Sequence, residues 1–121
     1  MAEAAAYRSR KVVVVGAGAV GSTFCYALAQ SGLADDIALI DRNADLAKGQ
    51  VLDLAHGQPF VPPVQIHVGD AGDYADAHVV VIAAGAGQRP GESRLELLRR
   101  NASVMESIID EITAQKSSAV I

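Results

Sequence analysis

The stretch "KVVVVGAGAVGS", residues 11–22, decides the fold of this 121-residue chain. Its first five residues are mostly β-branched and apolar, which predicts a buried strand. Three glycines follow, at Gly16, Gly18 and Gly21. From Val20 onward the apolar residues recur at helical spacing, so the glycines lead from a strand directly into a helix. A strand, a G-x-G-x-x-G turn and a helix in this order favour a dinucleotide-binding unit.

Each glycine has a physical task in such a turn. Gly16 allows the chain to turn sharply out of the strand, and Gly18 leaves room for a pyrophosphate to approach the backbone. Gly21 lets the helix pack closely against the strand. The positive end of the helix dipole and its free N–H groups then face the phosphates. A turn with only a structural role is the alternative interpretation.

An acidic residue at the end of the second predicted strand supports a dinucleotide-binding role for the glycine turn over a purely structural one. Asp41 lies where the dinucleotide motif expects a carboxylate that accepts hydrogen bonds from the adenosine ribose. The same charge would repel a 2′-phosphate, which favours NAD over NADP, although the adjacent Arg42 weakens this preference. A solvated helix-capping role is the alternative for Asp41.

The remaining pattern predicts a doubly wound parallel α/β sheet, the Rossmann architecture. Strands are expected at 37–40, 64–68 and 79–84, and the last residues, "SAVI", read as the start of a fifth strand. Helices are expected between them. These predictions rest on apolar residues at helical spacing (Val20, Phe24, Ala27, Leu28 and Leu33; Ala47, Val51, Leu54 and Ala55; Leu98, Ala102, Met105, Ile109 and Ile112). Ser93 and Glu96 fit a capping box at the start of the last helix. We expect residues 1–10 to be a tail and 11–121 to form the domain, truncated in its fifth strand.

Composition narrows the function classes. The net charge of −4 and the scattered arginines argue against nucleic-acid binding. The single cysteine excludes an intrachain disulfide and a cysteine zinc site, and we expect no metal. The apolar runs are too short for a membrane span, and the start does not read as a signal peptide, so we expect a cytoplasmic protein.

The segment "AAGAGQRPGESRL", residues 83–95, follows the fourth predicted strand. Ligands of doubly wound sheets bind beyond the carboxyl ends of the strands, where this loop begins. An arginine there can pair with a carboxylate or polarise a carbonyl. A glutamine there can select a small neutral substituent over a second carboxylate.

Together, "KVVVVGAGAVGST", "LIDRN" and "AAGAGQRPGESRLELLRRN" resemble the amino-terminal half of bacterial L-lactate dehydrogenases, in the lactate/malate dehydrogenase superfamily. The resemblance implies NAD as cofactor and a small 2-hydroxy or 2-oxo acid as substrate. It makes Arg94 the catalytic and substrate-binding arginine that polarises the carbonyl when the loop closes, and Gln88 the residue that selects pyruvate over oxaloacetate. It assigns further cofactor contacts to Val20, Gly85, Ala86 and Ser107. Arg89, beside the selector, is expected to be a solvated charge.

The sequence also departs from this family. Ala71 and Leu46 stand where some bacterial members have a tyrosine and a lysine near the adenine, so those two contacts are in doubt. Family members are much longer, and the residues that correspond to their catalytic histidine, its aspartate and a second arginine are not in this sequence. We therefore expect the chain alone to be inactive, and the complete enzyme to be a homotetramer. A malate dehydrogenase relative and a stand-alone NAD-binding module remain the alternatives.

Overall fold

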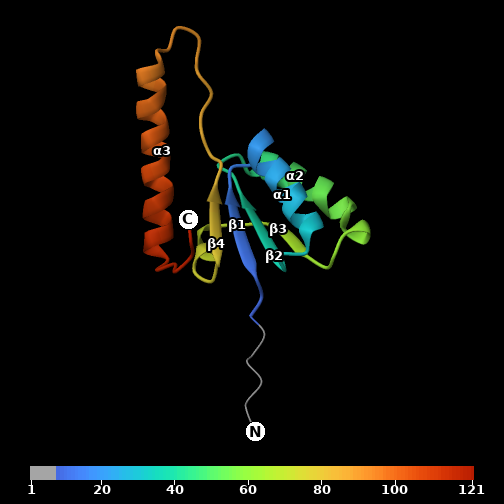
Figure 1. Ribbon diagram of the computed structural model, residues 1–121. Helices are drawn as coiled ribbons and strands as arrows, with labels where there is room; N and C mark the ends of the chain where they lie inside the picture. Colours follow the sequence, from blue (N-terminus) through green and yellow to red (C-terminus); the bar gives the residue numbers. More distant parts are fainter. Residues whose placement is uncertain (1–7) are drawn as a thin grey trace.

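The structure is a computed structural model that describes residues 8–121 as one parallel sheet with helices on both faces (Figure 1). Two short 3-10 helices, η1 and η2, flank the third strand. The elements in chain order are β1 (Lys11–Val15), α1 (Ala19–Ser31), β2 (Asp36–Ile40), α2 (Ala44–His56), η1 (Gln58–Phe60), β3 (Gln65–Val68), η2 (Ala71–Tyr74), β4 (Val79–Ile82) and α3 (Arg94–Ala114).

The four strands lie in the order β3-β2-β1-β4 and all pair in parallel. β1 is central: Val13 is in register with Ala38 of β2 on one side and with Val80 of β4 on the other. All three of these residues are buried. A strand buried on both faces requires a continuous apolar run, which explains the "VVVV" of β1. The predicted doubly wound parallel sheet is confirmed.

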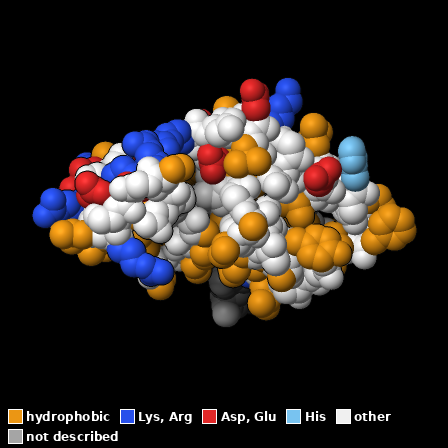
Figure 2. All heavy atoms as spheres, turned by 90° about the horizontal axis from the view of Figure 1, so that it is seen from above, with side chains coloured by type: hydrophobic (Ala, Val, Ile, Leu, Met, Phe, Trp, Pro, Cys, Tyr) orange, Lys and Arg blue, Asp and Glu red, His pale blue; other side chains and the backbone are white. Residues whose placement is uncertain are grey.

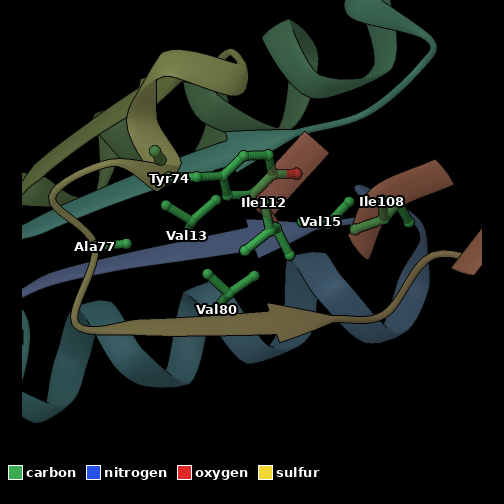
Figure 3. Packing of buried hydrophobic residues seen from close by; sticks show 8 residues of the cluster. Val13, Val15, Tyr74, Ala77, Val80, Ile108 and Ile112 are labelled. Carbon is green, nitrogen blue, oxygen red and sulfur yellow. The ribbon is translucent and has the colours of Figure 1, made fainter. Parts of the chain in front are cut away.

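The sheet separates two hydrophobic clusters. On one face α1 and α2 cover Val14, Ile37 and Leu39, and on the other α3 and η2 cover Val13, Val15 and Val80 (Figures 1 and 3). The chain changes face between β3 and β4, as it crosses from one edge of the sheet to the other. The switch point therefore lies between β1 and β4, and the carboxyl ends of these two strands frame the site described below.

The residues that α1 buries are not those whose spacing predicted the helix. The helix buries Gly21, Cys25 and Ala29, whereas Val20, Phe24 and Leu33 are exposed. The cause is close packing on β1, since a Cβ atom built on Gly21 would lie 1.7 Å from the carbonyl oxygen of Gly16. The three residues that α1 buries are all small.

The predicted apolar stripe of α3 is only partly buried. Ile112 and its neighbour Ile108 pack against the sheet, but Leu98 and Met105 are exposed. The first turns of α3 extend past the end of β4, so they have no strand to cover (Figure 1). None of the described helices combines the length and apolarity needed to cross a bilayer.

The segment expected to begin a fifth strand forms one parallel bridge, between Val79 and Val120, instead of a strand. Val80 N–H donates to the Val120 carbonyl at 2.8 Å, and Val120 N–H donates to the His78 carbonyl at 3.1 Å. This segment therefore pairs with the first residues of β4, next to the edge of the sheet.

Candidate cofactor-binding cleft

A cleft of about 740 Å³ opens at the carboxyl ends of β1, β2 and β4, with α3 as its far wall. Five of the sequence-predicted site residues line it: Gly16, Gly18, Asp41, Gly85 and Ser107. Val20, Gly21 and Ala86 are not among its lining residues. Sequence reasoning did not find Tyr74, Ser103 and Glu111, which also line it. These come from η2 and α3, and only the folded chain brings them to the glycine turn.

The glycine turn is built by close backbone contacts. Gly16 has a φ of +109°, and a Cβ there would lie 2.7 Å from backbone atoms of Ala83 and Ala84. Its N–H donates to the Ile40 carbonyl at 2.7 Å, which fixes the turn against β2. By contrast, a Cβ built on Gly18 would meet nothing within 4 Å. Gly16 and Gly21 therefore allow neighbouring backbone segments to pack closely, whereas Gly18 leaves open space at the cleft.

Asp41 lies half-buried where β2 ends, and each of its carboxylate oxygens accepts a backbone hydrogen bond. Oδ2 accepts from Ala17 N–H at 2.8 Å and Oδ1 from Asn43 N–H at 2.7 Å. The helix-capping alternative is wrong, because Asn43 caps α2 by accepting from Leu46 N–H. A carboxylate has about four acceptor sites, so these two bonds orient Asp41 and leave lone pairs for ribose hydroxyls.

These features fit the adenosine and pyrophosphate of a dinucleotide. Gly18 is the N-cap of α1 and supplies no side-chain cap, so the first-turn N–H groups stay available beside the open space. The positive end of the α1 dipole points to the same place. Leu46 lines the cleft, and Ala71 packs against the core. Because Leu46 is not a lysine and Ala71 is not a tyrosine, neither residue supplies the contact near the adenine that some bacterial family members make at its position.

The loop between β4 and α3 is organised around Glu92. Its carboxylate receives two hydrogen bonds from Arg100, Nε to Oε1 at 2.6 Å and Nη2 to Oε2 at 2.8 Å, and one from Arg89 N–H at 2.8 Å. These hydrogen bonds, above all those from Arg100, lower the pKa of Glu92 to about 2. Arg100 Nη2 also donates to the Gly87 carbonyl at 2.9 Å, so one arginine joins both arms of the loop.

The predicted substrate residues are not at the cleft in this conformation. Gln88 is exposed, and its Nε2 donates to the Glu92 carbonyl at 2.7 Å. Arg94 is exposed at the first position of α3, and among residues 8–121 its side chain has no hydrogen bond or ion pair. The Arg89 side chain is likewise exposed, as expected. The predicted Ser93–Glu96 capping box is confirmed: Ser93 Oγ accepts from Glu96 N–H, and Glu96 Oε2 accepts from Ser93 N–H.

None of the three histidines lines the cleft. His67 Nε2 lies 2.8 Å from Asp36 Oδ1, and His78 Nδ1 accepts a hydrogen bond from Lys11 N–H. The first contact connects β3 with β2, and the second connects the residue before β4 with β1. His56 ends α2. The described part of the chain therefore brings no imidazole to this site.

Comparison with known proteins agrees with the geometry. A family model described as lactate/malate dehydrogenase, NAD binding domain, matches residues 10–121. An L-lactate dehydrogenase of Treponema denticola is 57% identical over 94% of this chain, and one of Acetivibrio thermocellus is 50% identical over 93%. The crystal structure of a minor L-lactate dehydrogenase from Enterococcus mundtii superposes with a TM-score of 0.88 at 38% identity, over 92% of this chain. The chain spans 36% of the length of the first of these relatives and of that crystal structure.

Proposed function

Because this chain belongs to the lactate/malate dehydrogenase family as its NAD-binding domain, we propose that it is the cofactor half of an L-lactate dehydrogenase. In the complete enzyme, bound NADH would supply the hydride that reduces pyruvate to L-lactate. The observation that carries the choice of substrate is Gln88, a neutral residue in the loop beside the cleft. A neutral amide gives no ion-pair partner to the second carboxylate of oxaloacetate, which an arginine would provide.

The chain's own residues divide the work of binding. The Asp41 carboxylate, held by two backbone amides, accepts hydrogen bonds from the ribose and disfavours a 2′-phosphate. The open surface at Gly18 and the first-turn amides of α1 hold the pyrophosphate. Gly85 and Ser107 belong to the opposite wall. Val20, Gly21 and Ala86 do not line the cleft, and cofactor contacts at these three positions stay predictions.

Substrate handling requires the loop to move. Arg94 carries a positive charge that no described side chain neutralises, so it is available to a ligand. Loop closure would bring it to the carbonyl oxygen of the substrate, where it stabilises developing negative charge. For Gln88 to reach the substrate in the same motion, its hydrogen bond to the Glu92 carbonyl must break.

We further propose that residues 11–121 alone bind NAD without turnover, because no histidine of the chain lies at the cleft to exchange the proton. Residues 1–7 of the predicted tail lie outside the described residues, and Arg10, the last residue of that tail, pairs with Asp35 at 2.9 Å. The complete enzyme is proposed to be a cytoplasmic homotetramer, and the exposed apolar residues of α1 and α3 supply surface for such contacts.

A chimera tests the proposed function. Residues 10–121 are joined to the remaining part of the Treponema denticola relative, and NADH oxidation is followed with pyruvate and with oxaloacetate. We expect turnover of pyruvate, a shift toward oxaloacetate in Gln88→Arg, and a kcat about 100-fold lower in Arg94→Gln with unchanged NADH affinity. Arg89→Gln is the matched control, because it removes an exposed loop charge and should change none of these values.

Two results would overturn the proposal. A chimera that prefers oxaloacetate with Gln88 in place would favour the malate dehydrogenase alternative. A chimera that binds NADH and reduces neither acid would favour the stand-alone binding module.

A further inference from the structure

Tyr74 carries the one buried side-chain polar atom without a hydrogen-bond partner found among residues 8–121. The residue is 0% exposed, and it is the last residue of η2. Leaving a buried hydroxyl unpaired is destabilising, so such a group in a native protein requires an explanation.

The hydroxyl lies at the wall of the cofactor cleft. Tyr74 is one of the lining residues, together with Ser107, Ile108 and Glu111 of α3. Figure 3 shows the ring packed beside Val13 and Ile112, with its oxygen directed along β1 toward Val15 and Ile108. That direction leads to the carboxyl ends of the strands. Two exposed residues, Ser107 and Glu111, line the same cleft as the tyrosine.

The segment that carries Tyr74 is held firmly. Lys11 Nζ donates to Asp73 at 2.8 Å and to Asp76 at 2.7 Å, on either side of the tyrosine. Burial opposes the charge on Lys11, but these bonds outweigh it and raise the pKa of the ammonium group. Asp70 and Asp73 close a capping box around η2. Tyr74 is thus fixed in place and does not reach a partner by moving its own backbone.

The hydroxyl is also a proton donor at neutral pH. Burial, with a contribution from the negative charge of Glu111, raises the pKa of Tyr74 to about 12. A neutral phenol both donates and accepts, which suits a purine edge, where ring nitrogens accept and an exocyclic amine donates. Asp41 sits across the same cleft and would hold the ribose to which the purine is attached.

We propose that Tyr74 is a cofactor-positioning residue whose hydroxyl binds the adenine base of NAD once Ser107 and Glu111 turn aside. This inference rests on NAD binding and not on the choice of substrate. It adds to the site a residue of η2 that the sequence analysis did not identify. The hydroxyl would then have a partner only in the bound state.

Calorimetric titration of the 121-residue chain with NADH, ADP-ribose and nicotinamide mononucleotide tests the proposal. We expect Tyr74→Phe, which keeps the ring, to weaken NADH and ADP-ribose by the same factor, about five- to tenfold, and to leave nicotinamide mononucleotide unchanged. The unliganded Tm should stay equal or rise, because the unpaired hydroxyl is gone. Tyr26→Phe, an exposed position on α1 outside the cleft, is the matched control and should change nothing.

A second measurement needs no variant. In the wild-type chain labelled with ¹³C at tyrosine Cζ, one of the three tyrosine resonances should shift on saturation with ADP-ribose and not with nicotinamide mononucleotide. Equal affinities of Tyr74→Phe and wild type for ADP-ribose would overturn the inference. So would a lower unliganded Tm with unchanged binding, which would assign the hydroxyl to folding, and so would a wild-type chain that binds neither NADH nor ADP-ribose.

Discussion

At the scale of single residues, Gly18 and Gly21 lie in the same turn but have opposite surroundings. A Cβ on Gly21 would overlap the Gly16 carbonyl oxygen, whereas one on Gly18 would point into open space. Backbone cannot yield as a flexible side chain does, so a methyl group at Gly21 must push α1 away from β1. The motif therefore contains residues for folding and a residue for ligand access.

Paired alanine variants separate these two roles. Gly21→Ala should lower the free energy of unfolding by about 1–3 kcal/mol or more, because it overpacks the turn. Gly18→Ala should keep the unfolding free energy within about 1 kcal/mol of wild type, as a change at an N-cap does, yet weaken NADH at least tenfold. Denaturant unfolding and calorimetry measure the two effects. Full NADH affinity in Gly18→Ala would show that the pyrophosphate does not approach this surface.

At the scale of elements, the loop before α3 depends on one ion pair. Glu92 accepts from Arg100 and from the Arg89 backbone, and these contacts hold the loop together. The arrangement explains why Gln88 and Arg94 face solvent here.

The order of this loop should depend on pH. The pKa of Glu92 is about 2 in the folded chain, below the ordinary value of 4.5, so its stabilisation is fully present above pH 4.5 and is lost as pH falls toward 2. Protection of the Arg89 amide from hydrogen exchange, followed by NMR across this range, should fall accordingly. In Glu92→Gln the protection should already be low at neutral pH and show no such step. A step that persists in the variant would assign the transition to another carboxyl group.

Helices show where sequence reasoning succeeds and where it fails. The capping box of Ser93 and Glu96 is a local signal, and the sequence predicted it. The buried faces of α1 and α3 were not predictable, because the glycine contact with Gly16 and the overhang of α3 past β4 decide which side chains meet the sheet. Tyr74 escaped notice for the same reason: the crossover between β3 and β4 brings it to the cleft.

At the scale of the whole molecule, apolar side chains remain on the surface. Seen from above, Lys and Arg side chains gather mostly toward the α3 end of the molecule, and hydrophobic side chains are spread over the rest (Figure 2). Leu95, Leu98 and Met105 are 57%, 64% and 42% exposed and recur along one side of α3. An exposed stripe of this kind favours association.

We therefore expect the isolated chain to self-associate at micromolar concentration. Sedimentation velocity should show oligomers for wild type and mostly monomer for Leu95→Lys/Leu98→Lys, with an unchanged Tm because both side chains already face solvent. Leu33→Lys, at an equally exposed site after α1, serves as the control for added charge and should associate as wild type does. A monomeric wild-type chain would contradict the expectation.

The hydrogen bond from Ala17 to Asp41 restricts how cofactor preference can evolve in this domain. The carboxylate proposed to reject a 2′-phosphate is also the acceptor that anchors the glycine turn. A change of preference toward NADP cannot simply delete it, because the turn would lose its acceptor together with the negative charge. Mutational routes to the phosphorylated cofactor therefore pass through short polar residues that still accept from Ala17, and they keep the phosphate-binding turn while the charge is exchanged.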